Sequence, residues 1–282
     1  MSARTRRVAV VFVIMGAVLA GALVAVRSSR RPSTTAAGPA PKRVTAPAGG
    51  AASSSDDEVD AGDDGDAGTA IVEDARRYAV RTWSMPLDRY VLSIEDVGMK
   101  KTPLAALIAR TDAELVVNGG FFDPNGKALG LAISGGAVLS RASKQMSGGI
   151  LTFDGDRAKL WEAETFDVPE GTTFGVQCKP RLVVDSALNI RRDDGHRSER
   201  TALCIRDSGR SIDVVIVRDE SADMAGPSLF ALGRYLVKRG CESALNLDGG
   251  PSTGIAWRDE GRTQVMEPRG PIRHAIVFKK KP

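Results

Sequence analysis

Short apolar runs separated by turn residues constrain the fold of this chain more than any other feature. Three stretches, residues 130–140, 149–162 and 201–217, hold two such runs each, joined at clusters of Gly, Ser and Asp. This pattern is typical of β-hairpins, because those residues accept the backbone angles of a tight reversal. Two segments have helical spacing instead, and no regular strand-helix-strand repeat occurs. The sequence therefore predicts an α+β fold, a β-rich single domain of mixed sheets and hairpins with about two main helices.

Both predicted helices carry start and stop signals. The first covers residues 104–109 and follows Thr102 as its cap, with Pro103 at the first helical position, where the fixed φ of proline is favourable. The second opens at Ser228 and ends at Arg239 and Gly240, the cation and glycine that are common at a helix C-terminus. This second helix leads into a strand at residues 244–247.

The N-terminal quarter has a different composition from the rest. Residues 8–26 form an uncharged apolar run after three arginines, long enough to cross a bilayer as a helix. We expect residues 1–27 to be a signal peptide or membrane anchor, which places the rest outside the cytoplasm, in the periplasm or cell envelope. Residues 28–69 are rich in Pro, Ala and Ser and close with acidic residues, which predicts a disordered linker. Residues 70–282 have the size of one domain.

Charge and residue usage argue against several classes of protein. The net charge is +4, but no basic helix or stripe interleaved with aromatic residues is present, so we expect no nucleic-acid partner. Cys178, Cys204 and Cys241 form no C-x-x-C motif, which argues against a zinc or redox site. One pair could be oxidised in an exported protein, and the sequence leaves that pair open, with Cys204 read as a small buried hydrophobic residue. The only histidines, His196 and His274, are too few for a typical transition-metal phosphoesterase.

Two predicted strands end in related polar sequences. A carboxylate beside two glycines allows the backbone to turn sharply and to approach a ligand closely. Either segment alone is most often a plain turn, but a plain turn gains nothing from the additional aromatic and hydroxyl residues. Together they predict one shared polar site. The first segment is Asn118-Gly119-Gly120-Phe121-Phe122-Asp123, and the second is Asn246-Leu247-Asp248-Gly249-Gly250-Pro251-Ser252-Thr253.

These motifs, with Arg200-Thr201-Ala202 and the helix before the second motif, resemble the phosphodiester glycosidase domain family over roughly residues 115–278. The resemblance implies hydrolysis of a sugar-1-phosphodiester, similar to an N-acetylglucosamine-1-phosphodiester, between the anomeric carbon and the phosphate oxygen. The expected substrate is an envelope or exopolysaccharide glycan. The chain departs from the family at Lys179 and at Cys204, where glycines are usual, and such changes bear on which sugar fits the pocket.

The expected chemistry assigns roles to the site residues. Asp248 is expected to be the catalytic nucleophile or base, with Asp123 as its partner carboxylate, and Asn118 to orient the water or the sugar. Arg200 suits stabilisation of the departing phosphate. Asp219 and Asp223 are weaker candidates, since loop carboxylates usually face water. The remaining expected substrate-binding residues supply backbone N–H groups, an amide or hydroxyls: Gly119, Gly120, Asn246, Gly249, Gly250, Ser252 and Thr253.

Two other functions stay open at this point. The first is a noncatalytic envelope module that binds anionic glycans, although such a module would avoid carboxylates beside an anion. The second is a phosphodiesterase that cleaves the P–O bond, against which the scarcity of histidine argues. We expect no cofactor, with a hard cation such as Ca²⁺ or Mg²⁺ held by Asp123, Asp248 and carbonyl oxygens as the alternative.

Overall fold

The computed structural model describes residues 69–99, 102–218 and 225–282. The predicted membrane segment, nearly all of the predicted linker, and Asp219 and Asp223 lie outside these ranges. Within the described ranges, no helix is long and apolar enough to cross a membrane. The fold below therefore concerns the predicted domain alone.

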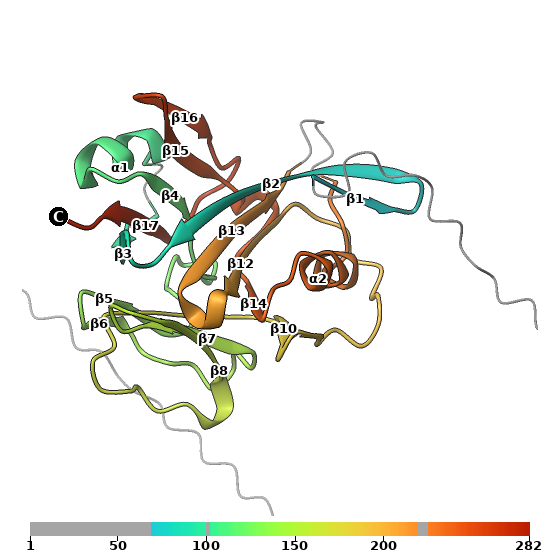
Figure 1. The fold of residues 1–282 in the computed structure, drawn as a ribbon, viewed down its shortest axis with the longest axis horizontal. Coiled ribbons are helices and arrows are strands. Elements are labelled where there is room, and N and C mark those ends of the chain that lie inside the picture. The colour runs from blue at the N-terminus through green and yellow to red at the C-terminus, as the bar shows by residue number, and fades with distance from the viewer. Residues whose placement is uncertain (1–68, 100–101, 219–224) are drawn as a thin grey trace, which may run out of the picture. The chain divides into compact units, whose positions relative to one another are not determined.

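Three antiparallel sheets make up this domain, and they occupy separate regions of Figure 1. The seven-stranded sheet runs, in spatial order, β1 (Ala70–Glu73), β2 (Arg76–Pro86), β13 (Ser211–Val217), β12 (Arg200–Arg206), β14 (Ser243–Asn246), β10 (Arg181–Val184), β11 (Ala187–Leu188). The second sheet runs β16 (Arg262–Met266), β15 (Ile255–Asp259), β4 (Leu115–Asn118), β17 (His274–Lys280), β3 (Tyr90–Asp96). The third runs β6 (Ala137–Ser140), β5 (Ala132–Ser134), β9 (Phe174–Cys178), β7 (Gly149–Phe153), β8 (Ala158–Glu162).

The predicted β-rich α+β class and the predicted hairpins are confirmed, but the sheets are antiparallel and not mixed as expected. Hairpin connections join neighbouring strands in opposite directions, and this gives antiparallel pairs. The hairpins are β5–β6, β7–β8 and β12–β13, each paired in antiparallel register. The second predicted helix is α2 (Leu229–Lys238), where the Ser228 hydroxyl accepts a hydrogen bond from the Ala231 amide at 3.0 Å. Gly240 follows this helix with a φ of 78°, a conformation that glycine adopts at little cost.

The first predicted helix is present as α1 (Leu104–Thr111), but its start differs from the prediction. Pro103 occupies the cap position rather than the first helical position, and no neighbouring side chain caps the helix. The carboxylate of Glu267 accepts hydrogen bonds from the amides of Leu104 at 3.0 Å and Ala105 at 3.4 Å. A residue remote in sequence therefore supplies the negative charge that a helix N-terminus favours.

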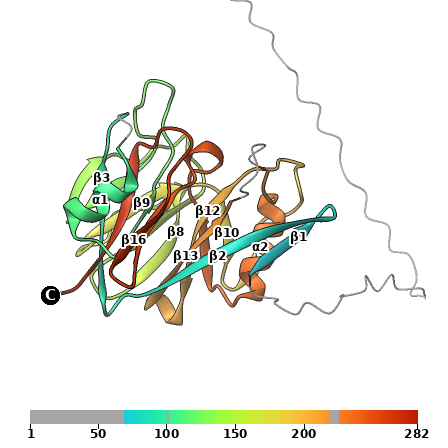
Figure 2. The same cartoon turned by 90° about the horizontal axis from the view of Figure 1, so that it is seen from above.

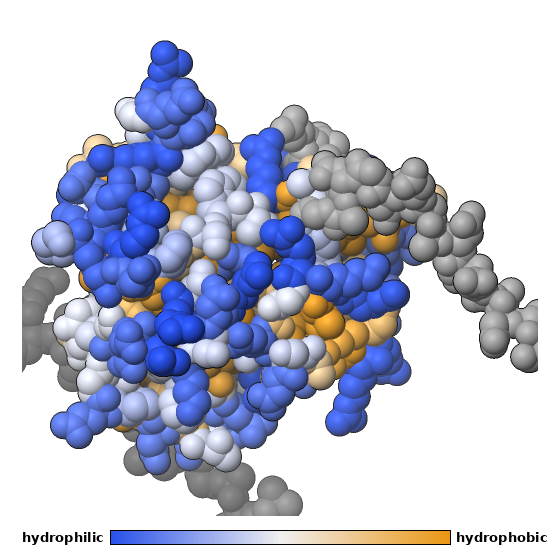
Figure 3. Space-filling view, in the orientation of Figure 1, coloured by the Kyte–Doolittle hydropathy of each residue, from blue (hydrophilic) through white to orange (hydrophobic). Residues whose placement is uncertain are grey.

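One apolar core lies between the three sheets. Leu203 from the first sheet, Phe278 from the second and Phe153 from the third belong to the same buried cluster. The two helices cover separate satellite clusters, α2 against the first sheet and α1 against the second, and Figure 2 shows α2 beside the β1–β2 ribbon. Polar residues cover most of the face in Figure 3, and the apolar ones there form separated areas.

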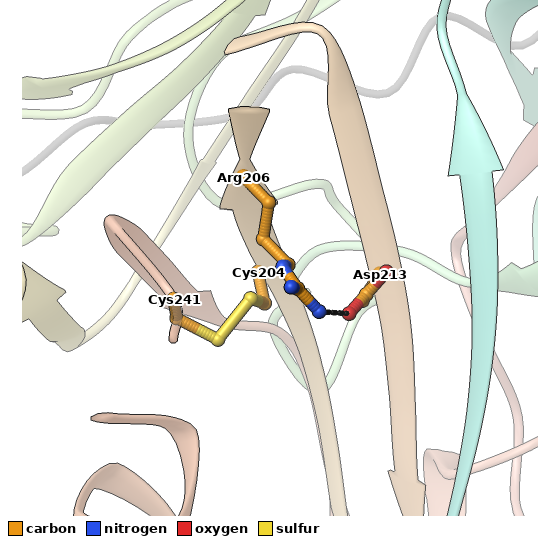
Figure 4. The surroundings of a disulfide bond; sticks show 4 residues. All are labelled: Cys204, Arg206, Asp213 and Cys241. Carbon is orange, nitrogen blue, oxygen red and sulfur yellow. Dashed lines mark hydrogen bonds and ion pairs between the residues drawn. A yellow bond between two sulfur atoms is a disulfide. The ribbon is translucent and has the colours of Figure 1, made fainter. Parts of the chain in front are cut away.

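A disulfide bond between Cys204 of β12 and Cys241, which follows α2, ties the helix end to the first sheet (Figure 4). Next to it, Arg206 pairs with Asp213 of β13 at 3.3 Å. Cys204 is buried as expected, but it is a disulfide partner and not a simple hydrophobic residue. Cys178 is free and fully buried, so the open question of pairing is resolved in favour of Cys204 and Cys241.

Candidate active site

The two polar strand ends lie side by side, although β4 and β14 belong to different sheets. The amide nitrogen of Asn118 donates a hydrogen bond to the backbone carbonyl of Asp248 at 2.7 Å. The backbone amide of Asp248 donates to the carbonyl of Gly119 at 3.2 Å. These bonds join segments that are 130 residues apart, so the two strand ends lie together, as a shared site requires.

Asp248 holds its carboxylate at the wall of a cavity of about 630 Å³. The side chain is partly buried, and one oxygen accepts a hydrogen bond from the Gly249 amide at 2.9 Å. Burial raises the pKa of the Asp248 carboxyl, and the hydrogen bond from the Gly249 amide opposes this shift. A carboxylate with a raised pKa is a stronger base than an ordinary aspartate.

The same cavity also contains a buried cation. Arg200, at the start of β12, lines it and is only 6% exposed. Its Nε donates to the carbonyl of Pro227 at 3.0 Å, and one Nη donates to the carbonyl of His196 at 2.9 Å. In the described part of the chain, no carboxylate forms an ion pair with this guanidinium. Arg200 therefore has charge available for an anion in the cavity.

The buried position of Arg200 affects the pKa of its guanidinium. Burial lowers the pKa of its guanidinium, while the charges of Asp194 and Glu73 oppose that shift. Arginine still remains charged in proteins. The cavity therefore combines a carboxylate of raised basicity with a buried cation.

Asn118 lies behind Asp248 and not in the cavity wall. It has no exposed surface, and its side-chain oxygen accepts hydrogen bonds from the Thr201 hydroxyl at 2.8 Å and the Gly254 amide at 3.2 Å. With the bond to the Asp248 carbonyl, both ends of the amide are engaged within the protein. This geometry fixes the backbone beneath Asp248, and it leaves no side-chain group of Asn118 facing the cavity.

Asp123 does not share the cavity of Asp248, contrary to the expected pair of carboxylates. It lines a second cavity together with His274. One of its oxygens accepts hydrogen bonds from the amides of Asn125 and Lys127, each at 2.9 Å. The carboxylate thus closes a turn of its own loop, which is a common local role of aspartate.

Gly119 and Gly120 in the first strand end, and Gly249 and Gly250 in the second, shape the backbone of the site. The expectation that Gly249 and Gly250 offer free amides to phosphate is wrong for this structure. Their amides donate to the Asp248 carboxylate and, at 2.9 Å, to the carbonyl of Glu199. A Cβ on Gly249 would lie 2.7 Å from that same carbonyl oxygen. Gly119 and Gly120 are buried, and a Cβ on Gly119 would lie 2.9 Å from the backbone oxygen of His274.

Three further predicted substrate-binding residues divide between the cavity and the interior. Asn246 lines the cavity, and its amide nitrogen donates to the carbonyls of Lys179 and Leu247, each at 2.8 Å. Ser252 and Thr253 do not line it: the Ser252 hydroxyl donates to the carbonyl of Pro271 at 3.1 Å, and Thr253 is fully buried. The backbone amides of Ser252 and Thr253 close the turn that follows Asp248, donating to the carbonyls of Gly249 at 3.2 Å and Gly250 at 3.0 Å.

The cavity also includes residues to which sequence reasoning gave no role in the site. Lys179 and His196 contribute polar groups, and Phe121, Leu229 and Pro251 contribute apolar surface. His196 lies four residues before Arg200 in a loop rich in charges of both signs, so its proximity to Arg200 was the one available signal. Lys179 was visible only as a departure from the usual glycine.

The described residues contain no cluster of side chains typical of a metal site. No group of three or more His, Cys, Asp or Glu side chains is close enough to hold an ion there. Asp123 and Asp248, the carboxylates expected to share a hard cation, line different cavities. These two carboxylates are therefore not placed to hold one cation together.

A family model of phosphodiester glycosidases matches residues 111–279. The chain belongs to this family of hydrolases, in agreement with the resemblance of the sequence motifs. A comparison with curated proteins gave no match.

The fold is shared with solved structures of low sequence identity. The catalytic domain of zebrafish N-acetylglucosamine-1-phosphodiester α-N-acetylglucosaminidase, auto-inhibited by its pro-peptide, has 16% identity and a TM-score of 0.60, over 76% of this chain and 81% of that one. A hypothetical protein from Synechocystis has 15% identity and a TM-score of 0.59, over 75% of this chain. The match spans 61% of the Synechocystis protein.

Proposed function

We propose that this protein hydrolyses the glycosidic bond of a sugar-1-phosphodiester. The observation that carries the proposal is that Asp248 and Arg200 line one cavity, a carboxylate of raised pKa with a buried cation. The proposed substrate resembles an N-acetylglucosamine-1-phosphodiester within an envelope or exopolysaccharide glycan. The family match and the fold shared with the zebrafish catalytic domain support this choice.

In the proposed reaction, Asp248 acts at the anomeric carbon, either as the nucleophile or as the base that removes a proton from water. The bond between that carbon and the phosphate oxygen breaks, and its electron pair stays on the oxygen. Oxygen from water ends on the sugar, and the other product is a phosphomonoester. Arg200 stabilises the negative charge of the departing phosphate, so this leaving group needs less protonation than a sugar alkoxide.

Other residues of the cavity support this chemistry. Asn118 holds the backbone carbonyl of Asp248 and so fixes the direction of the carboxylate. Lys179 and His196 bring further polar groups to the cavity, and Phe121 offers an apolar surface to a sugar ring. The mixed lining matches a ligand that has both an anionic group and the C–H faces of a carbohydrate.

We also propose an extracytoplasmic location, with residues 8–26 as an export signal or membrane anchor. The disulfide between Cys204 and Cys241 supports this proposal, because disulfides persist mainly in oxidising compartments outside the cytoplasm. Fusion of the first 69 residues to a reporter that is active only after export tests it. Retention of the fusion in the cytoplasm would contradict it.

The reaction is tested by turnover of a sugar-1-phosphodiester in ¹⁸O-labelled water. The expected result is that ¹⁸O appears in the released sugar, while Asp248→Asn gives no turnover and keeps the fold. Label in the phosphate product would instead indicate cleavage of the P–O bond. Binding without turnover by the unaltered protein would favour a noncatalytic glycan-binding module.

A further inference from the structure

A second cavity, of about 880 Å³, lies at the end of the second sheet. It is bordered by Asp96 at the end of β3, by Arg273 and His274 at the start of β17, and by the loop that holds Asp123 and Lys127. The Gly119 backbone stands between it and the active site, because its amide donates to the His274 carbonyl at 2.8 Å while its carbonyl accepts from Asp248. The proposed reaction uses none of the side chains in this cavity.

His274 brings a buried imidazole without a protein partner to this cavity. The residue is 4% exposed, yet no described residue hydrogen-bonds its ring nitrogens. Burial lowers the pKa of His274, which keeps the ring neutral at neutral pH, while Asp96 and Arg273 exert opposing charge effects on it. A neutral imidazole has one donor and one acceptor. Neither ring nitrogen of His274 is fully enclosed by the protein, so a ligand in the cavity can hydrogen-bond the ring.

Cations outnumber carboxylates among the charged side chains that line this cavity. Asp96 accepts hydrogen bonds from the Gly98 amide at 2.9 Å and from Arg273 at 2.5 Å, and the Asp123 carboxylate is engaged by its own loop. Lys127 and Arg141 also line the cavity, and no carboxylate in the described ranges forms an ion pair with either. The charged side chains that line the cavity are three cations, Lys127, Arg141 and Arg273, and two carboxylates, Asp96 and Asp123. They leave one net positive charge, which together with the His274 imidazole suits an oxyanion.

We propose that this second cavity is a binding site for a phosphate group, held by Lys127 and Arg141 and hydrogen-bonded to the His274 imidazole. The site is distinct from the cavity of Asp248 and does not rest on the proposed reaction. A phosphate group could enter as a free monoester or as a diester within a glycan chain, and the two sources share the same charged oxygens. Lys127 and Arg141 lie on the surface, so a ligand reaches them without opening of the fold.

The distribution of histidine provides the experiment. The chain has two histidines, one in each cavity, so the imidazole NMR signals of the full chain, without a histidine tag, report on the two cavities separately. His196→Gln assigns the signals. The probes are inorganic phosphate and dimethyl phosphate, with sodium chloride at matched ionic strength and glucose as the anionic and neutral controls.

We expect millimolar phosphate to shift the His274 signal in a saturable way that chloride and glucose do not reproduce. Lys127→Ala and Arg141→Ala should each weaken this binding by about tenfold, as expected for loss of a charge-assisted contact. Arg262→Ala, which removes an exposed cation at the start of β16, should leave it unchanged. Equal binding of dimethyl phosphate would identify a diester in a chain as the ligand, and selective binding of inorganic phosphate would identify a monoester.

Several results would overturn the proposal. These are an unchanged His274 signal, a shift that chloride reproduces, a response to glucose alone, or equal weakening by Arg262→Ala. A response of His196 alone would remove the second site and leave the proposed reaction intact. A response of His274 in a protein that shows no turnover would support the second site and contradict the proposed reaction.

Discussion

Replacement of Asn118 by alanine is the sharpest test of how the fold positions the active site. The change removes three buried hydrogen bonds, those to the Asp248 carbonyl, the Thr201 hydroxyl and the Gly254 amide. At about 1 kcal/mol each, and somewhat more where a buried partner is left unpaired, the expected loss is about 3 to 5 kcal/mol of unfolding free energy. For a domain of this size, that loss lowers Tm by about 10 °C.

The assay for this variant combines thermal unfolding with kcat on a sugar-1-phosphodiester. Thr201→Val is the matched control, since it removes only the hydrogen bond at 2.8 Å to the Asn118 oxygen and should cost about 1 kcal/mol. We expect kcat to fall in Asn118→Ala at temperatures where the variant is still folded, because the Asp248 backbone has lost its support. A Tm loss no larger than that of Thr201→Val, or an unchanged kcat, would refute the positioning role.

Three further predictions concern charge and covalent structure. Because burial raises the pKa of Asp248, the acid limb of kcat/KM should lie above the ordinary aspartate value of about 3.9. The folded protein then binds the Asp248 carboxyl proton more tightly than the unfolded chain does, so the free energy of unfolding falls as pH rises from the unfolded to the folded pKa. Asp248→Asn should therefore raise Tm at neutral pH, and a lowered Tm would contradict a destabilising effect of the Asp248 charge. Arg200→Lys keeps the positive charge but removes the guanidinium group that hydrogen-bonds the carbonyls of Pro227 and His196. KM should therefore rise by about tenfold, and an unchanged KM in steady-state assays would exclude Arg200 from phosphate binding. The Cys204–Cys241 disulfide closes a loop with a sequence separation of 37, so the double serine variant should lose about 3.8 kcal/mol of unfolding free energy, measured by denaturant unfolding. A loss well under about 1 kcal/mol would show that the disulfide restricts the conformational entropy of the unfolded chain very little.

The local elements of the fold were predictable because their signals are local. The turn residues at 134–136, 154–156 and 207–209 reverse the chain regardless of what surrounds them, and the three hairpins follow. Helix α2 was likewise set by its apolar spacing, by Ser228 and by Gly240. The start of α1 was not, because its capping carboxylate, Glu267, comes from a part of the chain about 160 residues away.

The sequence by itself determined the family, the hairpins and the two polar strand ends, since each depends on residues that are close along the chain. Only the tertiary structure decided which polar side chains meet. It brought Asp248 together with Arg200 and His196, sent Asp123 to a separate cavity with His274, and joined Cys204 to Cys241. The physical reason is that β4 and β14 lie in different sheets, and only the packing of those sheets over a common core fixes the direction of each strand end.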